Sequence, residues 1–174
     1  MAQAEDVKDS GRQIALHGRC LRNDKRPGSS GGFDHHDCFG RGDMTEASFR
    51  WHYGKAIPQL PSSLLYKGVV HTLSDKGIVT SFEPTTGKVI NQGRLEGAVD
   101  NFFAAPVAAD DKIWMVSESG KVVTLKSDGS LEILAVNELD DSCYATPAIA
   151  DGRIYIRTAS ALYSFGLAAD AGRD

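Results

Sequence analysis

From Ser48 onward, short runs rich in Val, Ile, Leu and Tyr follow one another and are separated by Gly, Asp, Asn and Pro. Runs of this length and composition, bounded by turn residues, are typical of β-strands. Residues 1 to 47 differ, because they are rich in Gly, Asp, Arg, Ser and His and show no sustained helical or strand period. Such a segment buries too little apolar surface to offset its ordering entropy. We therefore predict a disordered N-terminal tail over 1–47, a folded part over 48–166 and a C-terminal tail over 167–174.

The strand pattern of the folded part repeats, and Ser63, Pro106 and Pro147 open three copies spaced 43 and 41 residues apart. In each copy a short strand leads into a tight turn of two residues. These turn residues tolerate a positive φ, which a two-residue hairpin requires. The turns are Lys67-Gly68, Asp110-Asp111 and Asp151-Gly152.

Two or three further strands follow each of these turns. We expect second strands at 69–73, 112–116 and 153–157, and third strands at 78–82, 122–125 and 162–165. A fourth strand is expected in two copies only, at 88–94 and 131–136. Four strands per repeat of about 40 to 45 residues is the period of a β-propeller blade. The alternative is a β-sandwich of similar hairpins, which rarely repeats the same turn chemistry in register.

The sequence thus predicts an all-β fold of antiparallel four-stranded blades, about three in number, with the last one incomplete. Side chains alternate between the two faces of a strand. We expect one face of the second strands to be buried against the adjacent blade and Trp114 and Tyr155 to lie on the opposite face. The residues on the buried face are Ile113, Met115, Ile154 and Ile156.

The stretches PSSLLYKG, GIVTSFEPTTGKVI, ATPAIADGRIYIRT and ALYSFG resemble PQQ-like β-propeller proteins. This family includes relatives of the outer-membrane assembly lipoprotein BamB and the blades of quinoprotein alcohol dehydrogenases. The resemblance extends from about Gly42 to Gly166 and is closest to large bacterial proteins, often of planctomycete type, that end in a run of such blades. It implies a partial PQQ-like β-propeller that is a C-terminal fragment of a larger protein.

The family's blade-docking motif has the form A-x-D-x-x-T-G-x-x-x-W. Thr86 and Gly87 match this motif, Glu83 is a conservative change, and Asn91 stands where the family has a Trp that stacks between blades. Trp51 is similar to the Trp that ends the preceding blade's last strand. The resemblance therefore implies that docking between blades is weaker here than in the quinoproteins.

The charge and hydropathy of the chain narrow the classes of partner. A formal net charge of −4 gives no basic footprint for nucleic acid. No apolar run approaches the roughly 20 residues that span a bilayer. The acidic start does not resemble a secretory signal peptide, so the sequence indicates a cytoplasmic chain, or a periplasmic or secreted one if it is a fragment of a family member.

We find no metal, cofactor or catalytic site in the sequence. The cluster from Phe33 to Cys38 contains suitable ligand types, but no second ligand pair appears at finger-like spacing. We interpret the tripeptide 41–43 (RGD) as chance and Cys143 as a buried structural thiol. His52 and His71 fall within strands as satisfied or surface residues. Turn chemistry explains the carboxylates, which are Asp110, Asp111, Asp140, Asp141 and Asp151.

A quinoprotein holds pyrroloquinoline quinone and calcium over a complete ring with the help of a vicinal disulfide. The chain has no adjacent Cys pair, and Trp51 and Trp114 fall within strand patterns. The resemblance therefore predicts no cofactor and no enzyme activity. We expect a non-catalytic scaffold for protein–protein contact with an unknown partner. The alternatives are a fragment of a quinoprotein dehydrogenase or of a kinase-associated propeller protein.

Three blades are fewer than the four to eight that close a ring. We expect an open arc with two open edges, one before Ser63 and one after Phe165, and self-association through these edges. Residues 49–54 read as an outer strand without its blade. Their pairing with the strand at 162–165 is the alternative, because propellers often close by joining the chain ends.

Overall fold

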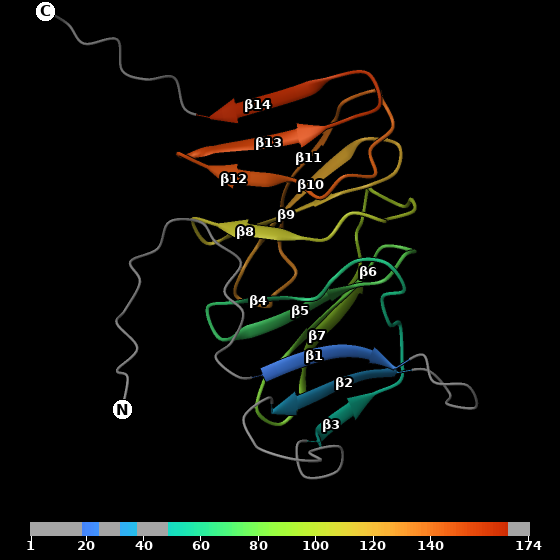
Figure 1. Ribbon diagram of the computed structural model, residues 1–174, viewed down its shortest axis with the longest axis vertical. Helices are drawn as coiled ribbons and strands as arrows, with labels where there is room; N and C mark the ends of the chain where they lie inside the picture. The colour runs from blue at the N-terminus through green and yellow to red at the C-terminus, as the bar shows by residue number, and fades with distance from the viewer. Residues whose placement is uncertain (1–18, 25–31, 38–48, 167–174) are drawn as a thin grey trace, which may run out of the picture.

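The computed structural model describes residues 19–24, 32–37 and 49–166, and it arranges them as successive antiparallel β-sheets (Figure 1). Strands are the only regular secondary structure in these ranges, and no helix in them is long and apolar enough to cross a membrane. The chain is therefore all-β, as the repeat predicts, and the sheets follow one another along the long axis of the molecule.

Two four-stranded sheets, blade 1 and blade 2, lie in the middle, and three-stranded sheets flank them. Blade 1 consists of β4 (Leu64–Tyr66), β5 (Val69–Leu73), β6 (Ile78–Phe82) and β7 (Val89–Arg94). Blade 2 consists of β8 (Val107–Ala109), β9 (Lys112–Val116), β10 (Lys121–Lys126) and β11 (Ile133–Glu138). Blade 3 consists of β12 (Ala148–Ala150), β13 (Arg153–Arg157) and β14 (Leu162–Gly166). The N-terminal sheet consists of β1 (Arg19–Asp24), β2 (Gly32–Asp37) and β3 (Phe49–Tyr53).

The hairpin turns that set the register are those that the sequence predicts. Both residues of each first turn have a positive φ, as a two-residue hairpin that follows the strand twist requires. Lys67 and Gly68 have φ of 46° and 78°, and Asp151 and Gly152 have φ of 50° and 69°. The predicted second strands of all three copies agree residue for residue with β5, β9 and β13.

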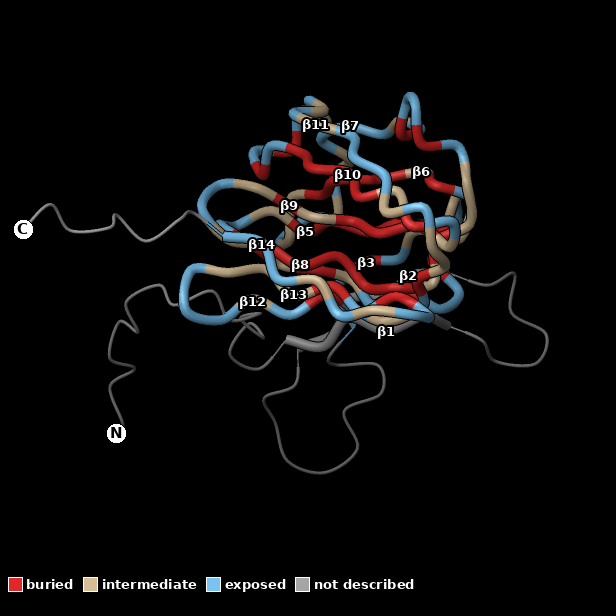
Figure 2. Tube along the Cα trace, turned by 90° about the horizontal axis from the view of Figure 1, so that it is seen from above, coloured by how far each residue is buried: buried red, intermediate tan, exposed pale blue. Residues whose placement is uncertain are grey.

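Apolar side chains pack between successive sheets and form the core. Figure 2 shows in red where the buried residues lie along the chain. Blades 1 and 2 enclose the largest cluster, which includes Leu73, Phe102, Ile113 and Met115. Ile156 is buried between blades 2 and 3, where Ile154 and Trp114 pack against it. Ile113 and Trp114 thus lie on opposite faces of β9, which confirms the predicted alternation.

The N-terminal sheet contains two strands that the sequence did not predict. Within that range the structure describes β1 and β2, and both are strands: β1 pairs with β2, and β2 pairs with β3. The remaining residues of 1–47 lie outside the described part. Backbone hydrogen bonds define this sheet, and its strands β1 and β2 show no alternation of apolar and polar residues. The sequence pattern therefore did not predict them.

The face of blade 1 that precedes Ser63 is also not open, in contrast to our prediction. Trp51 and Tyr53 of β3 cover Phe82 and Val70 on that face. Aromatic side chains bury a large apolar area, so two of them suffice to close the face of a short-stranded blade.

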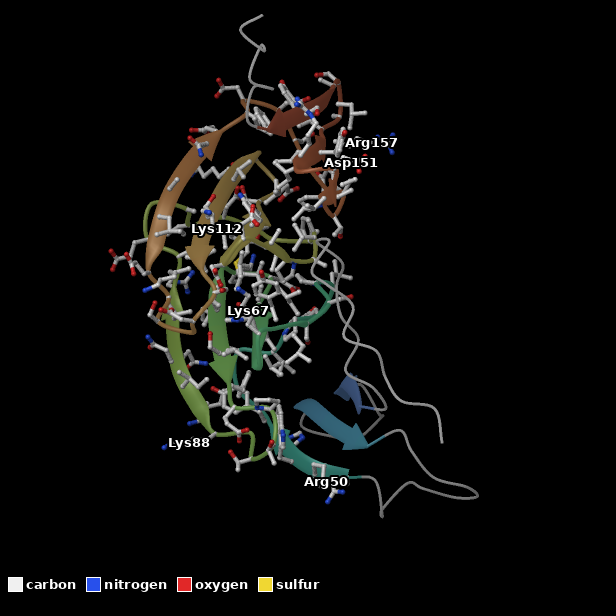
Figure 3. All side chains as sticks on the ribbon, turned by 90° about the vertical axis from the view of Figure 1, so that its left-hand side faces the viewer. Arg50, Lys67, Lys88, Lys112, Asp151 and Arg157 are labelled. Atoms are coloured by element: carbon white, nitrogen blue, oxygen red, sulfur yellow. The ribbon has the colours of Figure 1, made fainter. Side chains whose placement is uncertain are left out.

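The opposite end of the molecule remains open. β14 pairs with β13, and no described strand pairs with its other edge. Residues 49–53 pair with β2 and not with β14, so the alternative closure is wrong and the sheets form an open arc. Figure 3 shows this arc, with Arg50 and Arg157 at opposite ends and Lys67 and Lys112 between them.

Candidate protein-interaction surfaces

The N-terminal sheet docks on blade 1 through Trp51. Its indole Nε1 donates a hydrogen bond of 2.9 Å to the Pro84 carbonyl oxygen, and its ring stacks on Phe82 with 5.5 Å between centroids. The indole also lies so close to Gly87 that a Cβ there would fall 2.5 Å from the ring. Gly87 is therefore required by this close approach, as the motif predicts.

Glu83 shapes the loop that receives Trp51. Its carboxylate accepts hydrogen bonds from the backbone N of Thr85 (2.9 Å), from the backbone N of Thr86 (2.6 Å) and from the Thr86 hydroxyl (2.5 Å). The hydrogen bond from the Thr86 side chain is the largest cause that lowers the pKa of Glu83 to about 2. Glu83 thus caps the turn as an ionised carboxylate in the place of the motif's Asp.

Blade 2 docks on blade 1 at the position where the motif's Trp is replaced. The Asn91 side-chain amide donates a hydrogen bond of 2.8 Å to the Ser130 carbonyl oxygen. Ile90, its neighbour on β7, lies against Gly129 in the same turn of blade 2. An amide hydrogen bond and one aliphatic contact thus take the place of an aromatic stack, and weaker docking than in the quinoproteins stays a prediction.

The linkers between blades cross the turns that follow the second strands, and one contact recurs there. Asp100 accepts hydrogen bonds from the backbone N (3.0 Å) and hydroxyl (2.5 Å) of Ser119. Asp141 accepts the same pair from Ser160, at 2.9 and 2.7 Å. Turn chemistry alone does not explain Asp141, in contrast to our prediction. The spacing of 19 residues between acceptor and donor occurs twice in the sequence and could have revealed the contact.

Hydrogen bonding keeps both of these carboxylates ionised. Burial raises the pKa of Asp100, but hydrogen bonds from Ser117 and Ser119 outweigh that effect and lower it to about 2. Hydrogen bonds from Thr158 and then Ser160 lower the pKa of Asp141. The linkers are therefore fastened to the blades by charge-assisted hydrogen bonds.

The same linkers present a row of apolar side chains to solvent, which we call the linker row. It consists of Leu60, Phe103 and Tyr144, which stand at equivalent positions, four residues before the first strand of each blade. Leu60 is 63% exposed and Tyr144 is 59% exposed. The rings of Phe103 and Tyr144 stack with 5.7 Å between centroids. Phe103 itself is half-buried, so Leu60 and Tyr144 supply the exposed apolar surface, which is typical of a contact site.

A chain of hydrogen bonds holds Tyr144 in place. Its hydroxyl donates to Glu118 (2.8 Å), which also accepts from the Asn101 amide (2.8 Å). Asn101 in turn accepts from the Lys76 ammonium group (2.7 Å). Each of these residues comes from a different loop, so hydrogen bonds between loops hold Tyr144 in position although it is exposed.

The second candidate surface is the outer edge of β14, which we call the open edge. β14 contains Leu162, Tyr163, Ser164, Phe165 and Gly166 and has no charged residue. Leu162 and Phe165 are among the exposed large apolar residues of the molecule. The Arg153 guanidinium of β13 donates hydrogen bonds to the Ser164 hydroxyl (2.7 Å) and to the Ser164 carbonyl oxygen (3.1 Å), so a charged side chain from the neighbouring strand lies against β14.

His71 lies inside the molecule, between blades 1 and 2. Its Nδ1 is 3.0 Å from the Ser81 hydroxyl oxygen, and its Nε2 is buried without a partner among the described residues. Burial lowers the pKa of His71 to about 4, against smaller raising effects of the Ser127 backbone and the Asp128 charge. His71 is thus a packed core histidine, and its unpartnered Nε2 differs from the satisfied or surface residue that we predicted.

Cys143 is a buried free thiol, which agrees with the structural role predicted for it. Its Sγ donates to the carbonyl oxygen of Arg157 at 3.1 Å. Burial raises the pKa of this thiol, so the reactive thiolate is disfavoured.

The remaining candidates do not come together as a site in the described part. The cluster 33–38 falls on β2 up to Asp37, while Cys38 and residues 41–43 lie outside the described ranges. His52 lies on β3, where Asp34 is its strand partner. No group of three potential metal ligands occurs among the described residues. The turn carboxylates Asp110, Asp111, Asp140 and Asp151 all have a positive φ, which confirms their role in turns.

Successive antiparallel sheets of up to four strands, each packed face to face on the next, define a partial β-propeller. No family model and no curated protein matches the chain. Solved structures do share its fold, which is the PQQ-like β-propeller fold.

BamB from Moraxella catarrhalis matches with a TM-score of 0.67 and 17% identity, over 86% of this chain and 43% of its own. Quinohemoprotein alcohol dehydrogenase ADHIIG from Pseudomonas putida HK5 matches with a TM-score of 0.60 and 12% identity, over 82% of this chain and 27% of its own. A europium-containing methanol dehydrogenase matches with a TM-score of 0.52 and 12% identity, over 71% of this chain and 23% of its own. This chain thus spans less than half the length of each.

Proposed function

We propose that this partial propeller is a non-catalytic scaffold that binds a protein partner through the linker row. The observation that carries the proposal is the exposure of Leu60 and Tyr144 at equivalent positions of the linkers that precede blades 1 and 3, with Phe103 of the intervening linker stacked on Tyr144. Burying such side chains against a partner supplies the apolar contact area of an interface. The hydrogen bonds that fasten Tyr144 to Glu118 reduce the entropy that binding would cost.

Capture of partners from an extract of the source cells tests the proposal. A double variant, Leu60→Ser with Tyr144→Ser, removes the apolar anchors and should reduce retention of the partner at least tenfold. The matched control is Leu134→Ser with Val136→Ser, since these residues are also exposed apolar residues but lie on the outer strand β11. Equal retention by both double variants would contradict a role of the linker row.

A second candidate function is that of a segment of a quinoprotein dehydrogenase, because two of the matching folds are dehydrogenases. Under that alternative the chain should bind pyrroloquinoline quinone in the presence of calcium. We expect no saturable change of the quinone's absorption spectrum when the purified chain is added. A saturable change would favour the dehydrogenase alternative.

A further inference from the structure

His71 occupies a position in blade 1 at which the other two blades carry an aromatic residue. The strand pairing makes His71, Trp114 and Tyr155 equivalent, because each lies opposite a hydroxyl residue of the third strand of its blade. Trp114 packs in the apolar cluster between blades 2 and 3, while His71 is 1% exposed between blades 1 and 2. One of these two interfaces thus contains an ionisable ring where the other contains an indole.

A turn of blade 2, residues 127–130, lies against blade 1 beside His71. Gly129 in this turn is so close to blade 1 that a Cβ there would fall 3.5 Å from the Cβ of Ser81. The Asn91 amide donates its hydrogen bond to a carbonyl oxygen of the same turn. Strand pairing places His71, Ser81 and Asn91 side by side on β5, β6 and β7, so the turn rests on a row of polar side chains.

The imidazole of His71 fits this site in its neutral form. Its Nδ1 is near the Ser81 hydroxyl oxygen, and its Nε2 has no partner among the described residues. Protonation adds a second N–H and a positive charge, and both would be buried away from water. Burial accordingly outweighs the Ser127 backbone and the Asp128 charge and lowers the pKa of His71 to about 4.

The charged groups around the ring do not compensate for that burial. Asp128 is the charge that favours the protonated ring, but it is a smaller influence than burial. The residues opposite His71 on β4 and β6 are Leu64 and Ser81, which carry no charge. The charged groups of this interface are paired among themselves, Asp128 and Glu132 with Lys126, and Asp111 with Lys67.

The contacts between blades 2 and 3 respond differently to acid. Trp114 packs there with Cys143, and burial raises the pKa of this thiol, so the thiol stays neutral as the pH falls. The linker carboxylate of this interface, Asp141, stays ionised in mild acid, because hydrogen bonds from Thr158 and then Ser160 lower its pKa. These contacts therefore keep their charge at a pH at which an exposed histidine gains a proton.

We propose that His71 makes the interface between blades 1 and 2 an acid-sensitive hinge, which opens on protonation while the interface between blades 2 and 3 stays closed. Opening moves the turn 127–130 away from blade 1 and returns the charged ring to water. The Asn91 hydrogen bond and the contact of Gly129 are side-chain and van der Waals contacts, so this movement separates no strand pair. The N-terminal sheet with blade 1 then moves as one unit, and blades 2 and 3 move as another.

The lowered pKa of His71 sets the expected size of the effect. In the open form the ring has its ordinary pKa of 6.5, and in the closed form the pKa is about 4. The closed form is therefore fully favoured above pH 6.5 and loses this advantage as the pH falls toward 4. Between pH 7 and pH 5 the ratio of open to closed molecules should rise about twentyfold.

Two equivalent backbone amides report on the two interfaces. The Phe102 N–H joins a linker to blade 1 through the Asp75 carbonyl oxygen, and the Cys143 N–H joins the next linker to blade 2 through the Glu118 carbonyl oxygen, both at 2.9 Å. Hydrogen exchange of the full chain measures both amides after correction for the pH dependence of intrinsic rates. From pH 7 to pH 5 the protection of Phe102 should fall about twentyfold, while that of Cys143 should stay within about twofold.

One variant and one titration complete the test. His71→Gln keeps a hydrogen-bonding group beside Ser81 but does not titrate, so the protection of Phe102 should be equal at both pH values. NMR titration of the His71 ring in the unmodified chain, which needs no variant, should give a midpoint well below 6.5.

Four results would overturn the proposal. The first is a midpoint of the ring at or above 6.5, and the second is a protection of Phe102 that does not change with pH in the unmodified chain. The third is an equal fall at Phe102 and Cys143, because the whole arc would then open together. The fourth is a fall at Phe102 that persists in His71→Gln, because another group would then control the hinge.

Discussion

The two ends of the arc differ in how far an equivalent apolar residue of the blade is buried. At the N-terminal end, Trp51 and Tyr53 of β3 cover Phe82 of blade 1, and the apolar face of that blade is closed. At the C-terminal end, Phe165 stands at the position equivalent to Phe82 and stays exposed. The residue type is the same at both positions, so the difference lies in the neighbouring strands and not in the blade's own sequence.

This comparison shows what a blade needs beyond its own residues. The blade supplies the apolar residue, and the preceding sheet and the fourth strand together remove it from water. Blade 1 has both neighbours, whereas in the described part of the chain blade 3 has only the preceding sheet. The closed end is therefore where we expect stability to concentrate, and the open end is where we expect binding.

The largest expected effect comes from removing the cover at the closed end. Trp51→Ala removes the stack on Phe82 and the hydrogen bond to Pro84, and should lower the free energy of unfolding by about 3 to 5 kcal/mol. Phe165→Ala at the open end should change it by only about 0.5 kcal/mol, because Phe165 is already half exposed. Urea unfolding of both variants measures the difference. Equal losses would show that the two ends are equally closed.

A second effect of similar size depends on pH and arises from His71, which lies between blades 1 and 2. Burial lowers the pKa of His71 from 6.5 to about 4, so the unfolded chain binds a proton between these values and the folded chain does not. This contribution to stability is complete above pH 6.5 and is lost as the pH falls toward 4, by about 3 kcal/mol in total. Unfolding free energies measured from pH 7 to pH 4.5 should decrease accordingly.

The control for this pH dependence is the variant His71→Gln, which should flatten the decrease. The ionised carboxylates Glu83 and Asp100 lose their contribution only below about pH 4, because their pKa values are lowered to about 2. If the free energy of unfolding of the His71 variant still decreased between pH 7 and pH 4.5, other titratable groups would be the cause.

A smaller effect tests whether backbone strain in a turn costs the same free energy of unfolding at both ends. Gly152 has φ of 69°, and no atom lies within 4 Å of the place that a Cβ would take, so Gly152→Val costs only backbone strain, about 1 to 3 kcal/mol. Gly68, in the equivalent turn of blade 1, has φ of 78° and equally free surroundings. Gly68→Val should therefore cost the same within about 0.5 kcal/mol, measured by urea unfolding. A clearly larger cost at Gly68 would mean that the closed end amplifies local strain.

The sequence predicted the blades well because residues close together in the chain determine their turns and strands. The turn residues Lys67-Gly68 and Asp151-Gly152 require a positive φ, and their spacing shows the period. The strands β1 and β2 were not predicted, because β2 and β3 hold each other by backbone pairing across a long connection. The resemblance placed Trp51 at the end of the preceding blade's last strand, but its partner Phe82 was not predicted, since the contact joins residues 31 positions apart.

The sequence predicted one of the two candidate surfaces, the open edge, and not the other, the linker row. An open edge after Phe165 follows from the missing fourth strand of the third repeat. The linker row could not be predicted, because the exposure of Leu60 and Tyr144 depends on how the linkers cross the neighbouring turns. The repeated spacing from Asp100 to Ser119 and from Asp141 to Ser160 is the one signal in the sequence that pointed there.

Hydrogen exchange at single-residue resolution tests most directly whether β14 is an open edge. In the dilute chain, the amides of β6 and β10 should exchange slowly along their whole length, because both of their edges are paired. In β14, Leu162–Gly166, only alternate amides should be slow, since in an antiparallel pair every second residue directs its N–H toward the neighbouring strand β13. Slow exchange at every amide of β14, equal to that of β10 in the monomeric chain, would contradict the open edge.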